Sequence, residues 1–257
     1  MNNRIPILDR HTLAGRIKHK LRIHPELLFQ IPIGLSLILL VLSYLPYTTP
    51  LTPIFNPHMA HQMPNLPKQL LLQIPALILM TLVMMGSAAL PGIRHAGISS
   101  LYWRRKRSMA EYAFGYLSCW LLCDVLLMAC LMEFDMFFKK YQILITFLVI
   151  SAFWQTSFLK KRFMEKCHKV TNLPPKGYQA ELASIRFGIY NGSACVGTCW
   201  PLMAVAMSFT YGKIIFILLI TAYTTTERRH EKPGELFRLS GITFGVLSVL
   251  LLLQALL

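Results

Sequence analysis

The stretch GIYNGSACVGTCWPLMAVAMSFT, residues Gly188–Thr210, contains no charged side chain. A run of about 20 mostly apolar residues is long enough to cross a bilayer as an α-helix. Cys195 and Cys199 stand four residues apart within it, so they share one face of a helix. Met203 and Met207 continue the same spacing. The stretch therefore predicts a membrane-spanning helix with sulfur side chains along one side.

The whole chain has the composition of a membrane protein. Of its 257 residues, 54% are hydrophobic and 14% are charged, whereas a soluble domain has about 25% charged residues. The sequence therefore predicts an all-α, polytopic helical membrane protein with six to seven transmembrane helices. The candidate spans, of which the sixth is the shortest, are Leu27–Tyr47, Gln69–Leu90, Glu111–Met132, Tyr141–Leu159, Gly188–Thr210, Lys213–Thr226 and Leu239–Leu257.

The basic residues predict the orientation of these spans. All of the 26 lysines and arginines except Lys68, Lys139, Lys140 and Lys213 lie in the amino-terminal arm or in the loops after the second, fourth and sixth spans. Because loops rich in lysine and arginine stay inside, these segments are expected to be cytoplasmic. The net charge of +15 is thus explained by topology and lipid head groups, without nucleic acid as a partner.

The domain organisation that follows is simple. Residues 1–26 form a basic cytoplasmic arm, and residues 27–257 form a single helical membrane domain. The expected location is a bacterial inner membrane, crossed several times, with the amino terminus in the cytoplasm. The partners expected are the lipid bilayer and, as an option, other membrane subunits.

Sulfur side chains recur on three of the predicted spans. The cysteines lie in or next to spans and not in the outer loops, where an oxidising compartment favours disulfides, so we expect thiols. Thiolates and thioethers are soft ligands that favour Cu(I), although cysteine and methionine also serve as packing residues in apolar interiors. The candidate internal ligands are Met80, Met84, Cys119, Cys123, Cys195, Cys199 and Met203.

A second group of candidate ligands lies in the first outer loop. The segment NPHMAHQMPN, Asn56–Asn65, contains His58, Met59, His61 and Met63 and no charged residue. Imidazole and thioether together suit the capture of copper. The alternative is a polar loop with two incidental histidines.

Asp124 is the one acidic residue placed well inside a predicted span. A carboxylate in the middle of a membrane helix costs about 2.5–3.5 kcal/mol on insertion scales, and such groups usually face the protein interior and mark function. Asp124 is therefore a candidate metal ligand. A structural role near the outer end of the span is the alternative.

Several stretches resemble a bacterial family of predicted metal-binding integral membrane proteins. MMGSAALP at Met84–Pro91 is similar to the family's Met-Met stretch before a proline, and GYLSCW at Gly115–Trp120 is similar to its Gly-Tyr…Trp. GIYNGSACVGTCWPLM at Gly188–Met203 resembles its glycine-spaced segment ending in Cys-Cys-Trp-x-Leu-Met, with Thr198 in place of the first adjacent cysteine. The resemblance implies a multi-pass membrane fold and metal binding.

Three functions are compatible with these observations. The leading hypothesis is an integral membrane protein that binds or hands on a soft metal ion, with copper as the candidate. The first alternative is a non-catalytic accessory or assembly subunit of a larger membrane complex. The second is a membrane oxidoreductase using Cys195 and Cys199, which is the weaker hypothesis because thiols buried in apolar surroundings are inert. No catalytic residue is identified.

Overall fold

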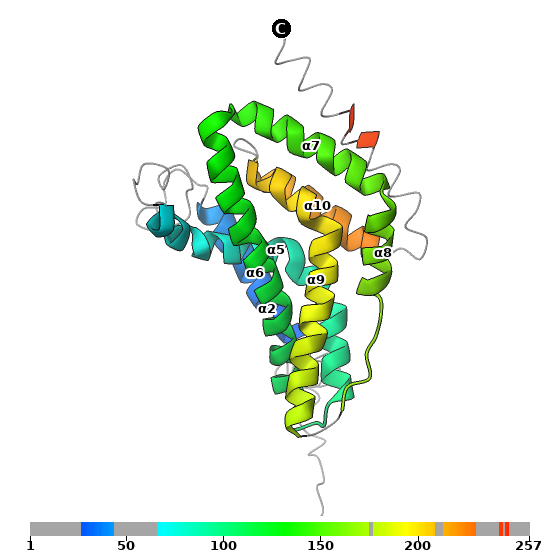
Figure 1. Cartoon of the computed structure of the whole chain (residues 1–257). Coiled ribbons are helices and arrows are strands. Elements are labelled where there is room, and N and C mark those ends of the chain that lie inside the picture. The colour runs from blue at the N-terminus through cyan, green and yellow to red at the C-terminus, as the bar shows by residue number, and fades with distance from the viewer. Residues whose placement is uncertain are drawn as a thin grey trace, which may run out of the picture.

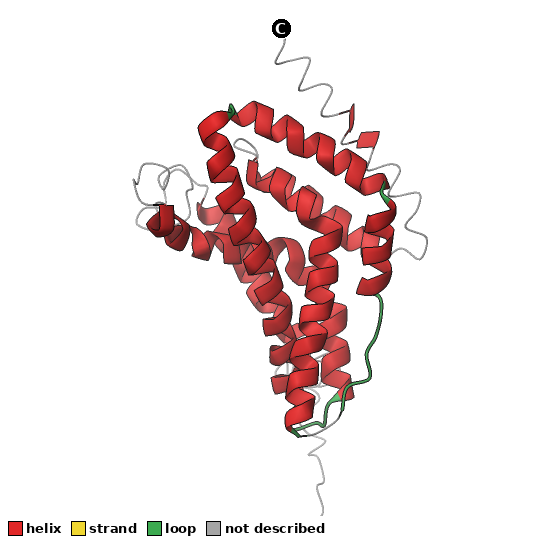
Figure 2. Ribbon diagram, viewed as in Figure 1, coloured by secondary structure: helices red, strands yellow, loops and turns green. Residues whose placement is uncertain are grey.

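The computed structural model describes residues 27–43, 66–174, 177–208, 213–229, 242–243 and 245–246. Within these ranges the chain forms helices and no strand, which confirms the all-α expectation (Figure 2). The helices are α2 (Leu27–Ser43), α5 (Leu66–Ser99), α6 (Arg105–Phe137), α7 (Lys140–Thr156), α8 (Phe158–Cys167), α9 (Tyr178–Ser208) and α10 (Lys213–Arg229). The basic arm at residues 1–26, the loop at Asn56–Asn65 and most of the expected last span lie outside the described residues.

Helices α6 and α9 run side by side in the same direction (Figure 1). They approach closely because glycines face the opposing backbone. A Cβ atom at Gly192 would lie 2.9 Å from the carbonyl oxygen of Tyr116, and one at Gly188 or Gly115 would also clash with backbone atoms of the other helix. Small residues let membrane helices pack with their backbones close together, so the register of α6 on α9 is set at these positions.

Helix α5 packs against α6 in the opposite direction. Two contacts define this pairing. The hydroxyl of Ser108, near the start of α6, donates to the carbonyl of Ala96 near the end of α5 at 3.2 Å, and Thr81, earlier in α5, contacts Asp124, later in α6. Helix α2 packs on α5, and α10 packs on both α5 and α9. The core therefore lies between α5, α6 and α9.

The expected fourth span is broken into two helices. Helices α7 and α8 meet at an angle of 70°, and Ser157 is both the C-cap of α7 and the N-cap of α8. The backbone of Ser157 is extended, and its hydroxyl accepts a hydrogen bond from the backbone N–H of Lys160 at 3.2 Å. Serine favours such capping positions over helix interiors, which explains why the helix ends before the expected boundary at Leu159.

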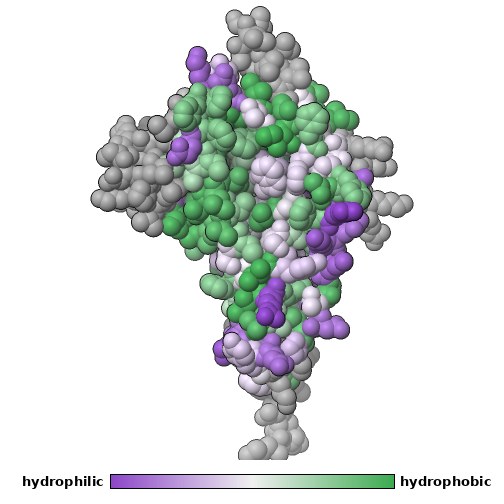
Figure 3. All heavy atoms as spheres, viewed as in Figure 1, coloured by the Kyte–Doolittle hydropathy of each residue, from purple (hydrophilic) through white to green (hydrophobic). Residues whose placement is uncertain are grey.

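Two described helical segments, Gln73–Ser99 and Arg105–Asp135, are long and apolar enough to cross a membrane, and the count rises to three if the bent α7–α8 pair is one span. The six to seven spans expected from the sequence are thus reproduced only in part. Figure 3 shows apolar side chains over much of the upper and middle part of the molecule, with hydrophilic ones at its upper left and along its lower right side. Exposed apolar residues on α6 include Phe114, Leu122 and Leu126.

Helix α9 is not among these apolar segments, although the sequence predicted a span there. It packs against α5, α6, α7, α8 and α10, and most of its residues after Phe187 are buried. A helix surrounded by other helices can carry small and polar residues such as Asn191, Gly192 and Thr198, which are buried, because its surface faces protein. The small and polar residues of α9 are therefore compatible with a central position among the other helices.

Candidate metal centre

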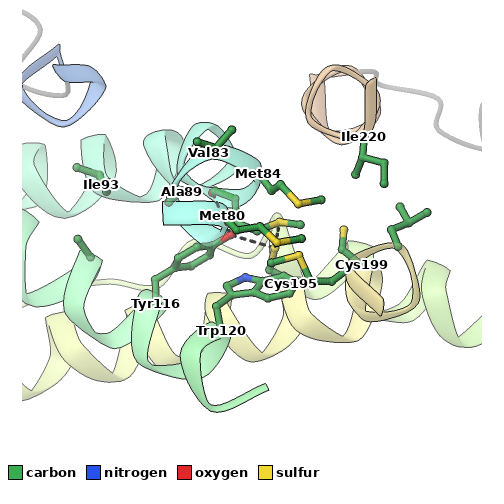
Figure 4. Packing of buried hydrophobic residues seen from close by; sticks show 14 of the residues in the cluster. Met80, Val83, Met84, Ala89, Ile93, Tyr116, Trp120, Cys195, Cys199 and Ile220 are labelled. Carbon is green, nitrogen blue, oxygen red and sulfur yellow. Dashed lines mark hydrogen bonds between the residues drawn. The ribbon is translucent and has the colours of Figure 1, made fainter. Parts of the chain in front are cut away.

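Sulfur side chains from α5 and α9 meet in the core. The i, i+4 spacing of Met80 and Met84, and of the three sulfur residues on α9, places each set on one helix face. We define the sulfur cluster as Met80, Met84 and Met85 of α5 with Cys195, Cys199 and Met203 of α9, all of which belong to one buried core. None of these side chains is more than 4% exposed. Figure 4 shows Met80, Met84, Cys195 and Cys199 gathered between the helices.

One sulfur–sulfur contact joins the two helices. Cys195 Sγ lies 4.0 Å from Met85 Sδ, with the thiol as donor. Cys199 Sγ, one turn further along α9, lies 3.4 Å from the hydroxyl oxygen of Thr198. All six cysteines are thiols rather than disulfides, which agrees with the expectation from their placement.

Aromatic side chains of α6 cover the sulfur cluster on one side. Tyr116 and Trp120 are at most 1% exposed and lie beside the sulfur atoms in Figure 4. The hydroxyl of Tyr116 donates a hydrogen bond to Cys195 Sγ at 3.0 Å. Helix α10 adds Ile217 and Ile220 to the same core. The sulfur cluster is therefore enclosed by apolar and aromatic groups.

A proline shapes α9 within the sulfur cluster. Pro201 has no N–H, so it cannot bond the carbonyl of Gly197 one turn earlier. The indole N–H of Trp154 on α7 donates to that carbonyl at 3.1 Å. Polar backbone groups freed by proline in such helices are satisfied by neighbours, and this contact holds the turn between Cys199 and Met203 in place.

Cys119 and Cys123, also predicted as ligands, lie outside the sulfur cluster. The face of α6 that packs inward carries Tyr112, Tyr116, Trp120 and Asp124, which are all buried. The two cysteines precede Trp120 and Asp124 by one position, which on a helix turns a side chain by about 100°. Both are only partly buried, and Cys119 Sγ donates to the carbonyl of Ile189 at 3.5 Å.

Asp124 is fully buried, at 0% exposed. One carboxylate oxygen, Oδ2, is hydrogen-bonded to the hydroxyl of Thr81, which adjoins Met80 on α5. The other, Oδ1, has no hydrogen-bond partner among the described residues. Asp124 therefore faces the protein interior, as its sequence position predicted, one turn beyond Trp120 and beside the sulfur cluster rather than within it.

Among the described residues, no group of three or more histidine, cysteine, aspartate or glutamate side chains is placed to hold a metal ion. A metal site in this part of the chain would therefore depend on methionine sulfur. Such a donor set, with thioethers in the majority, suits a soft monovalent ion and not Zn²⁺ or Mg²⁺. The predicted outer ligands His58, Met59, His61 and Met63 lie outside the described residues.

A second buried cluster is built around a lysine. We call Lys160, Gln155, Tyr223 and Glu227 the Lys160 network. The ammonium of Lys160, at 0% exposed, donates to Glu227 Oε1 and Gln155 Oε1. The hydroxyl of Tyr223 donates to Glu227 Oε1 at 2.7 Å. This network ties α8 to α10 beside the break at Ser157.

The sequence matches the PpoB2 family, described as copper chaperone, over residues 76–251. The chain belongs to this copper chaperone family. The matched region contains every residue of the sulfur cluster and of the Lys160 network. No curated protein and no solved structure matches the chain.

Membership of the copper chaperone family agrees with the metal binding that the resemblance implied, and it supports copper as the metal. The motifs that carried that resemblance meet at one place: Met84 and Met85, Tyr116 and Trp120, and Cys199 and Met203 all belong to one core. They come from α5, α6 and α9, which are distant in sequence. Their convergence makes the sulfur cluster the best-supported candidate metal centre among the described residues.

Sequence reasoning did not assign Met85, Tyr116 and Trp120 to the site. A signal was present, because each lies in a motif shared with the family, namely Met-Met and Gly-Tyr…Trp. Helix spacing alone could not reveal them, since the inward face of α6 is defined by its contacts with α5 and α9.

Proposed function

We propose that this copper chaperone is an integral membrane protein that binds Cu(I) in the sulfur cluster and hands it on. The proposed location is a bacterial inner membrane with the amino terminus in the cytoplasm. Residues 1–26 would form the basic arm and residues 27–257 a single membrane domain. His58, Met59, His61 and Met63 would collect copper on the outer side.

Three observations support the membrane location. Two described segments, Gln73–Ser99 and Arg105–Asp135, have the length and apolarity of spans. Large apolar side chains on α6 are exposed, including Leu122 at 65%, as expected for a lipid-facing surface. Ion pairs collect at the amino-terminal end of α6, where Arg107 contacts Glu181 at 2.8 Å and Glu111 at 3.1 Å. The positive-inside rule makes this end cytoplasmic.

The observation that carries the copper site is the pairing of Met85 and Cys195 across two helices. The bond from a thiolate sulfur to a first-row metal ion such as copper or zinc is about 2.3 Å long. Two sulfur ligands arranged trigonally about one ion at that distance lie about 4 Å apart. The measured Sγ–Sδ separation of 4.0 Å therefore allows one ion to bind both with little movement of either helix.

The remaining donors complete the coordination of a soft ion. Met80, Met84, Cys199 and Met203 belong to the same core, and thioether and thiolate favour Cu(I) over Cu(II). The ion would take the position that the Cys195 S–H proton holds between the two sulfurs. Loading would thus exchange Cu(I) for a proton, because the Cu–S bond forms as the S–H bond breaks. Copper affinity should therefore fall at low pH.

The oxidoreductase alternative is disfavoured by burial. Cys195 and Cys199 are at most 1% exposed, and thiol–disulfide exchange requires access for the attacking thiol. The contacts of Cys195 with Tyr116 and Met85 also involve no second cysteine of the kind that a disulfide would require.

The experiment that tests the proposal is metal analysis by mass spectrometry of protein purified in mild detergent and loaded with Cu(I) under reducing conditions. The parent protein should retain near-stoichiometric copper. The double variant Met85→Leu/Cys195→Ala, which removes the sulfur pair that joins the two helices, should lose it, and the matched control Cys130→Ser, at an exposed cysteine, should keep it. Full copper retention by the double variant, or none in the parent, would refute the internal site.

A further inference from the structure

Tyr116 is placed to act on the metal site without binding metal. Its hydroxyl lies 3.0 Å from Cys195 Sγ and 3.5 Å from the carbonyl oxygen of Met85. A phenol has a single proton to donate, and the shorter contact marks Cys195 as its acceptor. A phenol oxygen is a hard donor, unlike the soft ligands that Cu(I) prefers.

The packing of Tyr116 fixes this hydrogen bond. Its ring stacks on Tyr112, with centroids 6.2 Å apart and an interplanar angle of 22°. Gly192 allows α9 to approach the Tyr116 backbone, since a Cβ there would lie 2.9 Å from the Tyr116 carbonyl oxygen. The ring is 1% exposed, so water does not replace its contact with sulfur.

The strength of the hydrogen bond from Tyr116 depends on whether the Cys195 sulfur is neutral or carries negative charge. A hydrogen bond to an anionic acceptor is roughly twice as strong as one between neutral groups. The Tyr116 donor therefore stabilises the metal-bound form of the sulfur more than its metal-free form. The thiol of Cys195 donates toward Met85, so the proton and the incoming ion compete for the same position while Tyr116 occupies another side of the sulfur.

We propose that Tyr116 is a positioning residue of the copper site: its hydroxyl keeps the Cys195 sulfur aimed at Met85, strengthens its hydrogen bond when that sulfur binds a metal ion, and thereby raises the affinity for Cu(I). This inference rests on the proposed function of the sulfur cluster. Groups that hydrogen-bond to metal ligands typically contribute 10–100-fold to metal affinity.

The chain provides a matched control one helical turn away. Tyr112 is equally buried, but its hydroxyl accepts a hydrogen bond from Asn191 Nδ2 at 3.1 Å. Tyr116→Phe and Tyr112→Phe thus each remove one buried hydroxyl from stacked rings. Cu(I) affinity, measured by competition with a chelator of known affinity, should fall about 10–100-fold in Tyr116→Phe and change much less in Tyr112→Phe.

A spectroscopic measurement separates positioning from structural support. Cd²⁺ is a soft ion with a filled d shell, and its thiolate-to-metal charge-transfer band reports the energy of the sulfur lone pairs. Loss of the hydrogen bond raises that energy, so the band should move to lower energy in Tyr116→Phe and stay in place in Tyr112→Phe. A purely structural role would lower the Tm of both metal-free variants and leave the band unmoved.

A third variant tests the same inference if Tyr116→Phe fails to fold. Fluorotyrosine at position 116 retains the shape of the side chain and strengthens the donor, so the band should move to higher energy. An unshifted band, or equal Cu(I) affinity in both phenylalanine variants, overturns the role of Tyr116 while the copper site stands. A parent protein that binds no Cu(I) overturns the inference together with the proposed function.

Discussion

The sulfur cluster between α5 and α9 contains no charged side chain, whereas the Lys160 network between α8 and α10 contains a lysine and a glutamate that are equally buried. Both groups join helices that are distant in sequence. In the network, hard oxygen donors from Gln155 and Glu227 already hold a cation, the ammonium of Lys160.

The difference determines which of the two clusters is stable without a bound cation. A buried carboxylate is costly unless it is paired, so Glu227 requires a permanent partner, which Lys160 supplies. Neutral thiols and thioethers tolerate an apolar core without a partner, so the sulfur cluster can remain empty and still be stable. A site that must load and release an ion is therefore better built from sulfur than from carboxylates.

The largest expected effect comes from breaking the network. Lys160→Met leaves Glu227 buried and unpaired, which should reduce the free energy of unfolding by about 3–5 kcal/mol. Denaturant unfolding in detergent measures this loss. The double variant Lys160→Met/Glu227→Leu should recover most of the stability. Copper bound per folded molecule should be unchanged in both variants, and a parallel loss of copper would show that the two regions are not independent.

Next in size is the removal of a thiol from the sulfur cluster. Cys195→Ser keeps a hydroxyl of similar size near Tyr116 but replaces a soft donor with a hard one. Cu(I) affinity should fall at least about 100-fold, which corresponds to about 2.7 kcal/mol, as measured by chelator competition. Unfolding of the metal-free protein should change little. A variant with unimpaired affinity would remove Cys195 from the site.

The close contact of α6 with α9 gives a smaller effect on stability. Gly192→Ala adds a Cβ 2.9 Å from the Tyr116 carbonyl oxygen, and such overpacking typically costs about 1–3 kcal/mol. Gly34→Ala in α2 is the control, because nothing lies within 4 Å of its added Cβ. Thermal unfolding should show a lower Tm only for Gly192→Ala, and equal Tm values would contradict the close packing.

The smallest expected effect concerns one thioether. Met85→Leu conserves volume, so the stability of the metal-free protein should change by less than about 1.5 kcal/mol. Loss of the sulfur that contacts Cys195 should weaken Cu(I) binding about tenfold, or about 1.4 kcal/mol. Titration of both proteins with Cu(I) under reducing conditions measures the difference. An unchanged affinity would shift the site toward Met80, Met84 and Met203.

Much of the fold was predictable because its signals are local. The apolar runs predicted helices, and the spacing of Met80 with Met84 and of Cys195 with Cys199 predicted sulfur-bearing faces that the structure does place in the core. The break at Ser157 was not predicted, since the apolar pattern continues through it. A capping serine ends the helix there, and the pattern of apolar residues contains no information about such caps.

What the sequence by itself determined is therefore the helical class, the apolar surface and the chemical softness of the candidate ligands, because these depend on residue type and on spacing within one helix. The tertiary structure decided which sulfurs meet. The glycine contacts between α6 and α9 turn Tyr116 and Trp120 inward and leave Cys119 outside. It also paired Lys160 with Glu227, which lie 67 positions apart. Contacts between helices follow from packing geometry, which no spacing within a single helix can specify.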